Sequence, residues 1–423
     1  MLLNENKLRP LIISHNVICD STNNGKTIKS IFKNFNDSNI SQIYFRNEFP
    51  QSDFNSSYFK ITDYDIVKSF FSFSNKCGSE IVEIQTNKFP KSSLYKTKPT
   101  ILYILRDLVW LLRKNKNINL ESWLKKCNPS LIFFVASNNR FSYDLALKLS
   151  TRKNIPLIVY FTDDYILQNK KYNLFKYLHG YFIKKRFFAA CEISILRLVI
   201  GNKLGEAYSL MTGKKFETVM NLPILFSNEV ENIHNNGSFV FLYIGNLSLN
   251  RWKSLLQIAI IIDGLNINTI NLELRIYSLE NLSSNISNEF NKYKFVKFMG
   301  SERDKLKLFQ IIKSANIVLH VESFEKKMIE ITKFSISTKI SEYLAYGKCI
   351  LAYGPNEIAS INFLRENDLS ISCISNEELS NAIFKIVSGN YNLIDFENRS
   401  LKYFQKNMKD FDLKILLKHL FND

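Results

Sequence analysis

Cysteine is scarce in this sequence, and its six cysteines show no C-x-x-C spacing. They are Cys19, Cys77, Cys127, Cys191, Cys349 and Cys373. Because they are scattered and several lie in apolar runs, the pattern argues against a disulfide framework and a cysteine-rich metal site. We expect buried free thiols in a reducing compartment, which predicts a cytoplasmic location.

Long apolar runs are also missing. The opening MLLNENKLRP carries an acid and bases early, and no apolar segment with a small-residue cleavage site follows it. We therefore expect no signal peptide. No run approaches the roughly 18 uncharged apolar residues of a transmembrane helix, so we expect no membrane span.

Acidic residues are few relative to basic ones: 56 lysines and arginines outnumber 39 aspartates and glutamates and give a net charge of +17. A basic surface suits phosphate ligands, anionic lipid or nucleic acid. The sequence has no RNP-like, zinc-binding or helix-turn-helix signature, so we expect no nucleic-acid partner. With 423 residues, of which 46% are hydrophobic, the chain is long enough for two or three packed domains.

Strand patterns alternate with helix patterns along the chain, which predicts an α/β fold. Before residue 227 the strand patterns are residues 10–18, 41–46, 58–61, 81–84, 131–135, 156–161 and 197–201, the last of which is expected to close the first domain. After residue 238 they are residues 239–244, 272–277, 295–298, 317–321 and 349–353. The polar, turn-rich stretch 227–238 predicts a hinge between two domains.

The most informative stretch is residues 333–355, KFSISTKISEYLAYGKCILAYGP. Ser335 and Ser337 are candidate N-caps of a short helix, which Gly347 ends before a buried strand. A helix N-terminus offers free N–H groups and the positive end of its dipole, both of which favour a phosphate. Glu342 is expected in the first turn, where it has a simpler explanation as a carboxylate that complements the dipole.

Residues 342–351, EYLAYGKCIL, resemble the donor-nucleotide site of GT-B fold glycosyltransferases, especially glycosyltransferase family 4. Members of that family carry the pattern E-A-(M/L)-A-(A/S)-G-x-P-(V/I)-(V/I). The resemblance implies that Glu342 binds the donor ribose. It also implies that the residues before the helix bind the donor phosphates, namely Ser337, Thr338 and Lys339.

The family has another glutamate eight residues before the first one of this pattern, and it contacts the donor sugar. Here Phe334 stands at that position. Glu322 and Glu330 are the candidate substitutes, and the sequence leaves open which of them, if either, takes the role. The stereochemistry of transfer also stays open for this reason.

A second part of the resemblance follows the strand pattern 239–244. The sequence GNLSLNRWKS is similar to the family's loop that holds the donor diphosphate, and its matching residues are Gly245, Asn246, Arg251 and Lys253. Gly300 and Ser301 lie where the family places its base-binding loop. Cations that face a departing diphosphate stabilise it, so we expect no metal and no other cofactor. Alternatively, Arg251 and Lys253 are only solvated side chains at the start of a helix.

Candidate acceptor-side residues follow strand patterns of the first domain, because ligands bind at the carboxyl ends of strands in open α/β sheets. Asp163 and Asp164 are candidates for base catalysis or acceptor binding, or else cap the next helix. His15 is a third catalytic candidate, although a single histidine is more often structural.

The loop NNGKT after the first strand pattern resembles the first acceptor-side loop of this glycosyltransferase group, with Asn24, Gly25 and Lys26 as its candidates. The run from Asp20 to Thr27 also approaches a phosphate-binding P-loop. Asp20 takes the place of the first required glycine, however, and this argues against a P-loop.

Residues 170–188, KKYNLFKYLHGYFIKKRFF, combine basic and aromatic side chains. This composition suits the surface of an anionic membrane. A helix packed by its aromatic face explains the pattern equally well. A peripheral position at the inner membrane face is thus one expectation for this stretch.

The strand and helix patterns predict two α/β domains, and the resemblance implies the GT-B architecture, in which two Rossmann-like domains face a central cleft. Expected parts are an acceptor-side domain (residues 1–226), a hinge (227–238), a nucleotide-sugar domain (239–400) and a terminal amphipathic helix (401–423) that packs back on the first domain. The expected reaction is transfer of a hexose-type sugar from a nucleotide-sugar to a glycan or lipid-linked acceptor, in surface polysaccharide or glycoconjugate synthesis. The alternatives are a nucleotide-sugar epimerase of the same fold and a non-catalytic nucleotide-sugar-binding subunit.

Overall fold

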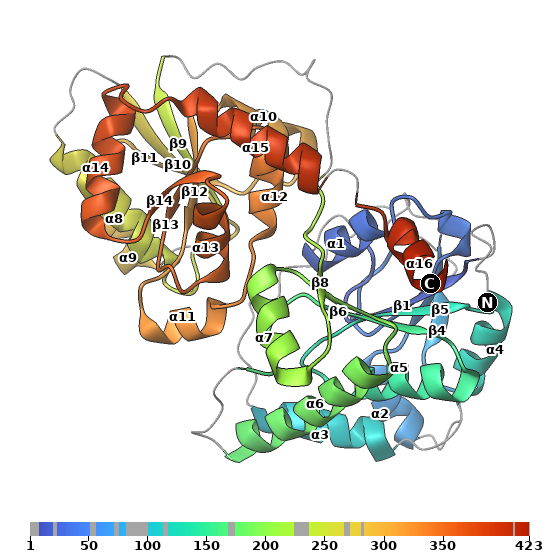
Figure 1. Cartoon of the computed structure of the whole chain (residues 1–423). Helices are drawn as coiled ribbons and strands as arrows, with labels where there is room; N and C mark the ends of the chain where they lie inside the picture. The colour runs from blue at the N-terminus through green and yellow to red at the C-terminus, as the bar shows by residue number, and fades with distance from the viewer. Residues whose placement is uncertain are drawn as a thin grey trace. The chain divides into compact units, whose positions relative to one another are not determined.

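The computed structural model describes most of the chain. The described residues are 8–19, 23–50, 56–71, 76–81, 100–112, 117–167, 174–223, 237–265, 271–280, 283–408 and 411–422. The chain forms two compact units (Figure 1). The first domain is Met1–Asn221 with Phe411–Asp423, and the second domain is Leu222–Asp410. Most of the predicted hinge lies outside the described residues.

The described part of the first domain contains one eight-stranded sheet with the order β4-β3-β2-β1-β5-β6-β7-β8. Its strands are β1 (Pro10–Ser14), β2 (Ser41–Tyr44), β3 (Ser57–Lys60), β4 (Ser79–Ile81), β5 (Leu131–Val135), β6 (Leu157–Phe161), β7 (Leu196–Val199) and β8 (Glu217–Thr218). Neighbouring strands are parallel, except that β4 runs antiparallel to β3. The prediction that residues 197–201 form the last strand is wrong, because β8 pairs outside β7.

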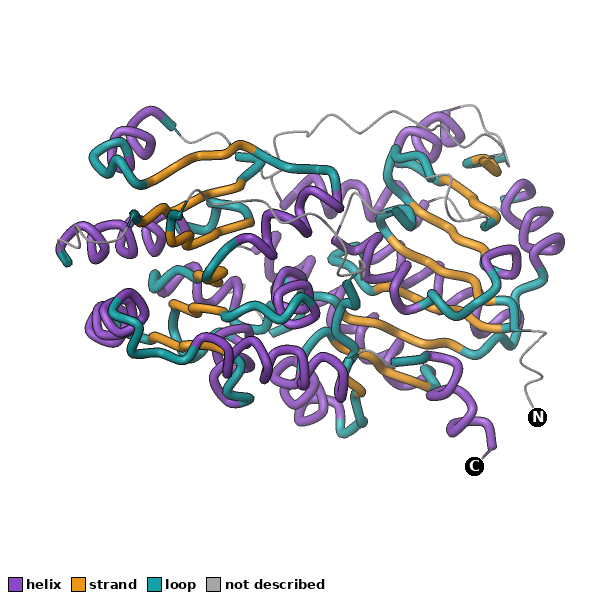
Figure 2. Tube along the Cα trace, turned by 90° about the horizontal axis from the view of Figure 1, so that it is seen from above, coloured by secondary structure: helices purple, strands orange, loops and turns teal. Residues whose placement is uncertain are grey.

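Helices lie on both faces of this sheet (Figures 1 and 2). They are α1 (Asn23–Ile31), the 3-10 turn η2 (Asp37–Asn39), α2 (Asp63–Phe71), α3 (Thr100–Leu112), α4 (Ile118–Cys127), α5 (Arg140–Lys153), α6 (Leu174–Ile193), α7 (Asn202–Thr212) and α16 (Leu413–Asn422). In Figure 1, α2, α3 and α6 lie together on one side, and α1 and α16 lie on the other. The β1, β5 and β6 strands are buried throughout because both faces of the sheet are covered.

The chain end forms two helices where one amphipathic helix was expected over residues 401–423. The first, α15 (Leu393–Asn407), belongs to the second domain, and α16 belongs to the first. Asp412, just before α16, accepts a hydrogen bond of 2.8 Å from Asn34, and the Lys414 ammonium lies 5.1 Å from the ring centre of Phe35. The return of the chain to the first domain therefore involves only its last helix.

The described part of the second domain contains a six-stranded, fully parallel sheet with the order β11-β10-β9-β12-β13-β14. Its strands are β9 (Phe239–Ile244), β10 (Leu272–Tyr277), β11 (Val296–Gly300), β12 (Ile317–Val321), β13 (Ile350–Tyr353) and β14 (Ser370–Cys373). Its helices are α8 (Arg251–Gly264), α9 (Ser284–Phe290), α10 (Lys305–Ser314), α11 (Lys326–Thr332), α12 (Thr338–Ala345), α13 (Ala359–Glu366), α14 (Asn376–Val387) and α15.

Local sequence explains where several helices of the second domain begin. The Asp304 carboxylate accepts the Lys307 N–H at 2.8 Å before α10, and the Ser375 hydroxyl accepts the Glu378 N–H at 3.1 Å before α14. These caps satisfy amides that have no partner within the helix. Apolar side chains from five of the strands then form the core, for example Phe241, Leu274, Leu319, Leu351 and Ile371.

The expected fold class is confirmed, since both units are α/β domains with Rossmann-like parallel sheets. All six cysteines are free, and all except the half-buried Cys127 are buried, as their apolar surroundings predicted. Within the described residues, no helix has both the length and the apolar character needed to cross a membrane.

Candidate functional site

The predicted helix exists, and Ser337, the second of its two candidate N-caps, is the one that precedes it. Ser337 precedes α12 in an extended conformation, and its hydroxyl accepts the Lys339 N–H at 3.3 Å. Gly347 follows the helix with a φ of 61°, and a Cβ at this position would come within 2.7 Å of the Leu401 side chain. Glycine is therefore needed here both for its backbone conformation and for the close packing of α15.

The prediction that Glu342 stands in the first turn of this helix is wrong. α12 begins at Thr338 and has no acid in its first turn, so Glu342 lies in the second. There the Lys339 ammonium donates to Glu342 Oε2 at 2.7 Å, and both side chains are largely covered. The dipole therefore does not explain Glu342, since that effect fades beyond the first turn.

Arg251 is the first residue of α8, directly after the loop that follows β9. Its Nε donates to Glu322 Oε2 at 3.0 Å and its Nη2 donates to Glu322 Oε1 at 2.8 Å. Glu322, just beyond the end of β12, is only 3% exposed. Burial raises the pKa of Glu322, while the bidentate contact with Arg251 favours its charged form.

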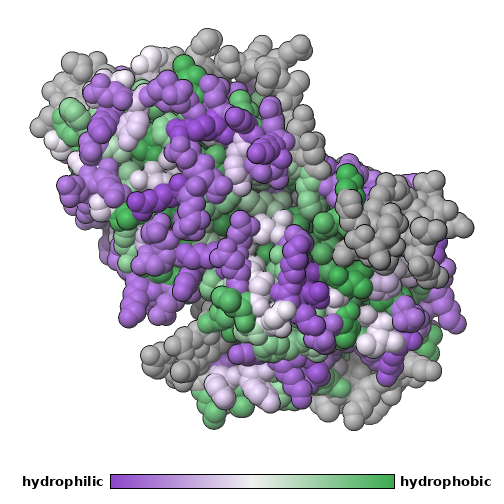
Figure 3. Space-filling model, viewed as in Figure 1, coloured by the Kyte–Doolittle hydropathy of each residue, from purple (hydrophilic) through white to green (hydrophobic). Residues whose placement is uncertain are grey.

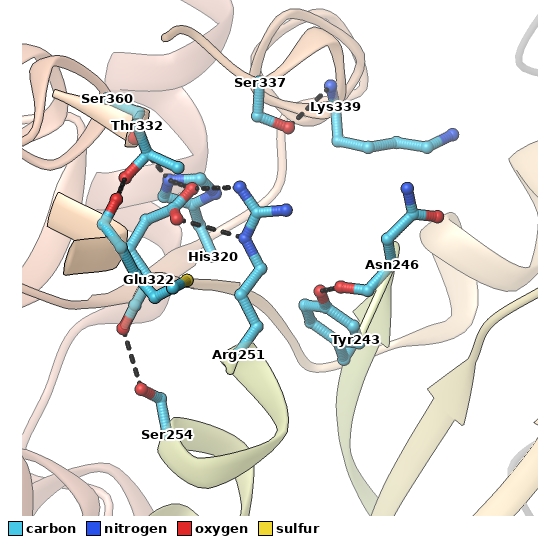
Figure 4. Close-up of polar contacts among 11 residues, drawn as sticks. Tyr243, Asn246, Arg251, Ser254, His320, Glu322, Thr332, Ser337, Lys339 and Ser360 are labelled. Carbon is cyan, nitrogen blue, oxygen red and sulfur yellow. Dashed lines mark hydrogen bonds and ion pairs between the residues drawn. The ribbon is translucent and has the colours of Figure 1, made fainter. Parts of the chain in front are cut away.

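Three further residues complete the surroundings of this ion pair (Figure 4). The Ser254 hydroxyl donates to the Glu322 carbonyl at 2.7 Å, and His320 Nε2 lies 2.8 Å from the Ser360 hydroxyl. Burial, followed by the nearby Arg251, lowers the pKa of His320 to about 3, so its imidazole is neutral. The Glu322 carboxylate is thus buried and holds the Arg251 guanidinium in position.

Lys253 points to a different carboxylate. It forms an ion pair with Glu325, whose other oxygen accepts a 2.7 Å hydrogen bond from Asn250. The contact with Lys253 holds the pKa of Glu325 below its usual value. Glu325 pairs with Lys253, one of the predicted phosphate-binding cations, and remains partly exposed. Glu330, by contrast, is exposed on α11.

Backbone amides of the loop after β9 bind a carboxylate. The Leu247 and Ser248 amides both donate to Glu280 Oε2 at 2.7 Å. The Tyr243 hydroxyl donates to the Asn246 carbonyl at 2.6 Å, and a Cβ on Gly245 would lie 2.9 Å from that hydroxyl oxygen. Gly245 is therefore required for the close approach of Tyr243, which fixes the loop.

Figure 4 shows the Arg251, Lys339 and Asn246 side chains around one open area of the close-up. The second terminal nitrogen of Arg251 points away from Glu322 toward this side. The second domain therefore brings together the predicted residues of the β9–α8 loop and of α12. Gly300 and Ser301 lie apart from this group along the sheet, since Gly300 ends the edge strand β11 and Ser301 directly follows it.

In the first domain, Asp164 has a structural role. Its Oδ1 accepts the Ile166 and Leu167 amides at 2.9 Å each and the Tyr208 hydroxyl at 3.0 Å, and the residue is buried. A carboxylate with these partners stabilises the turn after β6. Asp163, which is half-buried next to it, remains the candidate for contact with an acceptor.

The prediction that Asn24, Gly25 and Lys26 form a loop is wrong, because α1 already begins at Asn23. Residues 20–22 of the proposed P-loop pattern lie outside the described residues. The buried Thr27 hydroxyl donates to Asn221 Oδ1 at 3.3 Å. Within the described residues, no group of three or more His, Cys, Asp or Glu residues is arranged to hold a metal ion.

Comparison with known proteins identifies the architecture. No family model matches the chain, and no curated protein matches it in sequence. Solved structures, however, match nearly its whole length. Anabaena HepE in complex with UDP has a TM-score of 0.55 at 12% identity, over 98% of this chain and 99% of that one.

Two further structures match with similar coverage. A trehalose-6-phosphate structure from E. coli bound with UDP-2-fluoro glucose has a TM-score of 0.60 at 10% identity, over 97% of this chain and 98% of that one. The lipopolysaccharide outer core galactosyltransferase WaaB has a TM-score of 0.55 at 14% identity, over 98% of each chain. The chain has the GT-B fold. At these identities the likeness establishes the fold and leaves the activity to the site residues.

Proposed function

We propose that this protein is a glycosyltransferase that moves a sugar from a nucleotide-sugar to a glycan or lipid-linked saccharide acceptor. The observation that carries this proposal is that the β9–α8 loop and the start of α12 in the second domain of a GT-B fold supply three cations, each oriented by its own carboxylate: Arg251 by Glu322, Lys253 by Glu325 and Lys339 by Glu342. Two similar structures hold UDP or a UDP-sugar, which supports uridine diphosphate as the nucleotide.

The donor diphosphate would lie at the N-terminus of α12, where amides and Lys339 face it. The outer N–H groups of Arg251 add a second cation, because its contact with Glu322 uses only Nε and Nη2. Lys253, held by Glu325, supplies a third charge near the loop after β9. These cations stabilise the leaving diphosphate as the bond to the sugar breaks, so transfer by this route needs no cofactor.

Glu342 is proposed to bind the donor ribose, since its carboxylate is oriented by Lys339 and its oxygens are acceptors for hydroxyl groups. For the donor sugar we propose Glu325 in place of the glutamate that Phe334 replaces. Glu322 is less suitable because both of its oxygens bind Arg251.

The proposal predicts saturable binding of UDP, measured by calorimetric titration with GDP as a comparison. A Lys339→Ala variant is expected to bind UDP at least tenfold more weakly, because a charged hydrogen bond contributes about 1.5–3 kcal/mol. Lys385→Ala is the matched control, since Lys385 is exposed on α14, and its affinity should equal that of the wild type. If the folded protein binds neither nucleotide, the transferase proposal fails.

The first domain also supports a peripheral position on a membrane. Large apolar and aromatic side chains are exposed on α6, which we call the α6 outer face: Leu174, Phe175, Tyr177, Leu178, Tyr181, Phe182 and Phe188. Exposed lysines alternate with them, namely Lys176, Lys184 and Lys185, and no acid occurs between residues 174 and 191. Basic and aromatic side chains on one exposed face suit an anionic lipid surface.

Neighbouring helices extend this face. α3 packs against α6 and exposes Leu105 and Leu108, and α2 packs against α3 and exposes Tyr64, Val67 and Phe71. In the view of Figure 3, hydrophobic side chains are more frequent on the first domain than on the second, whose visible face is largely hydrophilic. The proposed occupant of the α6 outer face is therefore an anionic bilayer surface.

A Phe175→Ser/Tyr181→Ser variant should lose most of its binding to vesicles that contain one quarter phosphatidylglycerol in phosphatidylcholine. We expect a decrease of roughly tenfold or more in the partition coefficient, because two aromatic side chains no longer enter the interface. Leu210→Ser is the matched control, since Leu210 is 90% exposed on α7 and does not belong to the α6 outer face. Equal binding of the double variant and the wild type in a flotation assay would rule out this face as the contact.

A further inference from the structure

The carboxylate of Glu280 is hydrogen-bonded to the loop that leads to Arg251. Glu280 follows β10, which lies beside β9 in the sheet, so the chain segments after the two strands meet at one edge. Its Oε2 accepts the Leu247 and Ser248 amides at 2.7 Å each. Hydrogen bonds from amides to a carboxylate are about twice as strong as those between neutral groups. Glu280 therefore connects the β9–α8 loop to the end of the neighbouring strand.

The loop needs such support because two of its residues have a strained backbone. Leu249 and Asn250 have positive φ angles of 57° and 59°. Asparagine tolerates this left-handed conformation, whereas a bulky side chain such as leucine rarely adopts it. Strained residues of this kind persist where surrounding contacts determine the backbone, and they are frequent in ligand-binding loops. The two amides that Glu280 holds come directly before this strained pair.

The residues that Glu280 holds also receive the first amides of α8. The Ser248 carbonyl accepts the Arg251 amide and the Leu247 carbonyl accepts the Trp252 amide, both at 3.4 Å. The Leu247 carbonyl and the Ser248 N–H belong to one planar peptide group, which is rigid. This group therefore links Glu280 to the first turn of α8, from which the Arg251 side chain extends.

Two carboxylates thus hold the two ends of Arg251. Glu322 contacts its guanidinium through both oxygens. Glu280 acts on its backbone by way of the loop, and the Tyr243 hydroxyl, which donates to the Asn246 carbonyl, fixes the start of the same loop (Figure 4). An arginine that is held at both ends loses little entropy when an anion binds. The direction of its outer N–H groups therefore depends on Glu280 as well as on Glu322.

We propose that Glu280 is a positioning residue of the donor site, which keeps Arg251 directed at the diphosphate of the nucleotide. This inference rests on the proposed transferase function. Its carboxylate acts on the loop amides and not on the nucleotide. The competing explanation is that Glu280 occupies amides that a donor phosphate would otherwise bind. The two explanations predict opposite changes of affinity when the carboxylate is removed.

The test measures UDP affinity by calorimetry in variants of Glu280. Glu280→Ala should bind UDP about tenfold more weakly, because Arg251 is no longer held in the direction that the diphosphate requires. Glu280→Gln should bind within roughly threefold of the wild type, since its side-chain oxygen accepts the same two amides. Asp263→Ala is the matched control. It removes the same charge from an exposed position in the last turn of α8 and should leave the affinity unchanged.

A double-variant cycle shows whether Glu280 acts through Arg251. Arg251→Lys keeps the positive charge but loses the planar group with its fixed donors. Because residues that act together are not additive, Glu280→Ala should weaken UDP binding less in the Arg251→Lys background, by a factor of roughly three or more. In the Lys339→Ala background its effect should be undiminished, since Lys339 belongs to α12. Hydrogen exchange of second-domain amides should match the wild type in the single Glu280 variants, which separates a change in the site from a loss of stability.

The outcomes distinguish this inference from the proposed function. If the wild type binds UDP and Glu280→Ala binds it with unchanged affinity, the inference is overturned while the proposed function stands. Tighter binding by Glu280→Ala and Glu280→Gln also overturns it, because the carboxylate would then compete with the donor phosphate.

Glu280→Asp decides the question if Glu280→Ala does not fold. Its side chain keeps the charge but is one methylene shorter, so its carboxylate no longer reaches both amides in place. Weaker UDP binding by this variant supports the inference, and wild-type affinity overturns it. If the folded wild type binds no UDP, the proposed function fails, and the inference fails with it.

Discussion

Replacement of Arg251 by alanine is expected to lower the free energy of unfolding of the second domain by roughly 3–5 kcal/mol and to abolish nucleotide binding. Glu322 is only 3% exposed and directs both oxygens at Arg251. Without the guanidinium, a buried carboxylate either stays charged with no partner or takes up a proton, and both states are costly. Hydrogen exchange of second-domain amides measures the loss of stability, and calorimetry with UDP measures the loss of binding.

A double variant separates these two effects. In Arg251→Met/Glu322→Leu both members of the pair are replaced by apolar side chains of similar size, and such replacements are often neutral for stability. We expect near wild-type protection of the second domain but no recovery of UDP affinity, because the cation is still absent. Wild-type stability of the single Arg251→Ala variant would contradict a buried ion pair, and recovery of UDP binding in the double variant would contradict a role of Arg251 in the donor site.

Local patterns predicted the elements of this fold well. The stretch around α12 is an example, since the Ser337 hydroxyl and the backbone freedom of Gly347 act on neighbouring residues, and both ends of the helix followed from them. The buried strands β5, β6 and β12 were equally clear, because their apolar runs are short and bounded by polar residues. Errors of a few residues, as at the start of α1, reflect competing caps that sequence alone does not rank.

The partners of the site residues could not be predicted in the same way. Arg251 and Glu322 are 71 residues apart, and His15 and Asn139 are 124 apart. Only the strand order brings them together, by placing β12 beside β9 and β5 beside β1. A glutamate directly after the apolar run IVLHV was the available signal for Glu322, since a carboxylate at the end of a buried strand needs a partner.

Glu342 shows how a candidate site residue can be singled out while its position in the helix is predicted wrongly. The sequence placed it in the first turn, where the helix dipole alone would explain it. In the structure it lies one turn later and is held by Lys339, so it needs an explanation from its surroundings. The proposed contact with the donor ribose supplies one, and it remains a prediction until nucleotide binding is measured with variants of this pair.

The stability of the second domain should fall as the pH is lowered from about 6.5, because of His320. Burial, followed by the positive charge of Arg251, lowers the pKa of His320 from 6.5 to about 3. Between these values the unfolded chain binds a proton that the folded domain does not, so acid favours unfolding. The loss is about 1.4 kcal/mol for each pH unit and approaches roughly 4–5 kcal/mol near the lower end of this window. Above pH 6.5 the contribution is complete and constant.

A His320→Gln variant isolates this effect from the carboxylates that titrate in the same window. Glutamine carries no ionisable group but retains an amide that reaches toward Ser360, which lies 2.8 Å from the histidine ring. We expect the variant to be less stable than the wild type at pH 7 and the difference to disappear by about pH 4, in urea unfolding followed by hydrogen exchange of the second domain. Ser360→Ala is the control, because it keeps the histidine and should keep the pH dependence. If the free energies of unfolding of His320→Gln and the wild type changed in parallel from pH 7 to pH 4, the pKa of His320 would not change on folding. The conclusion that a neutral imidazole lies next to Arg251 would then be wrong.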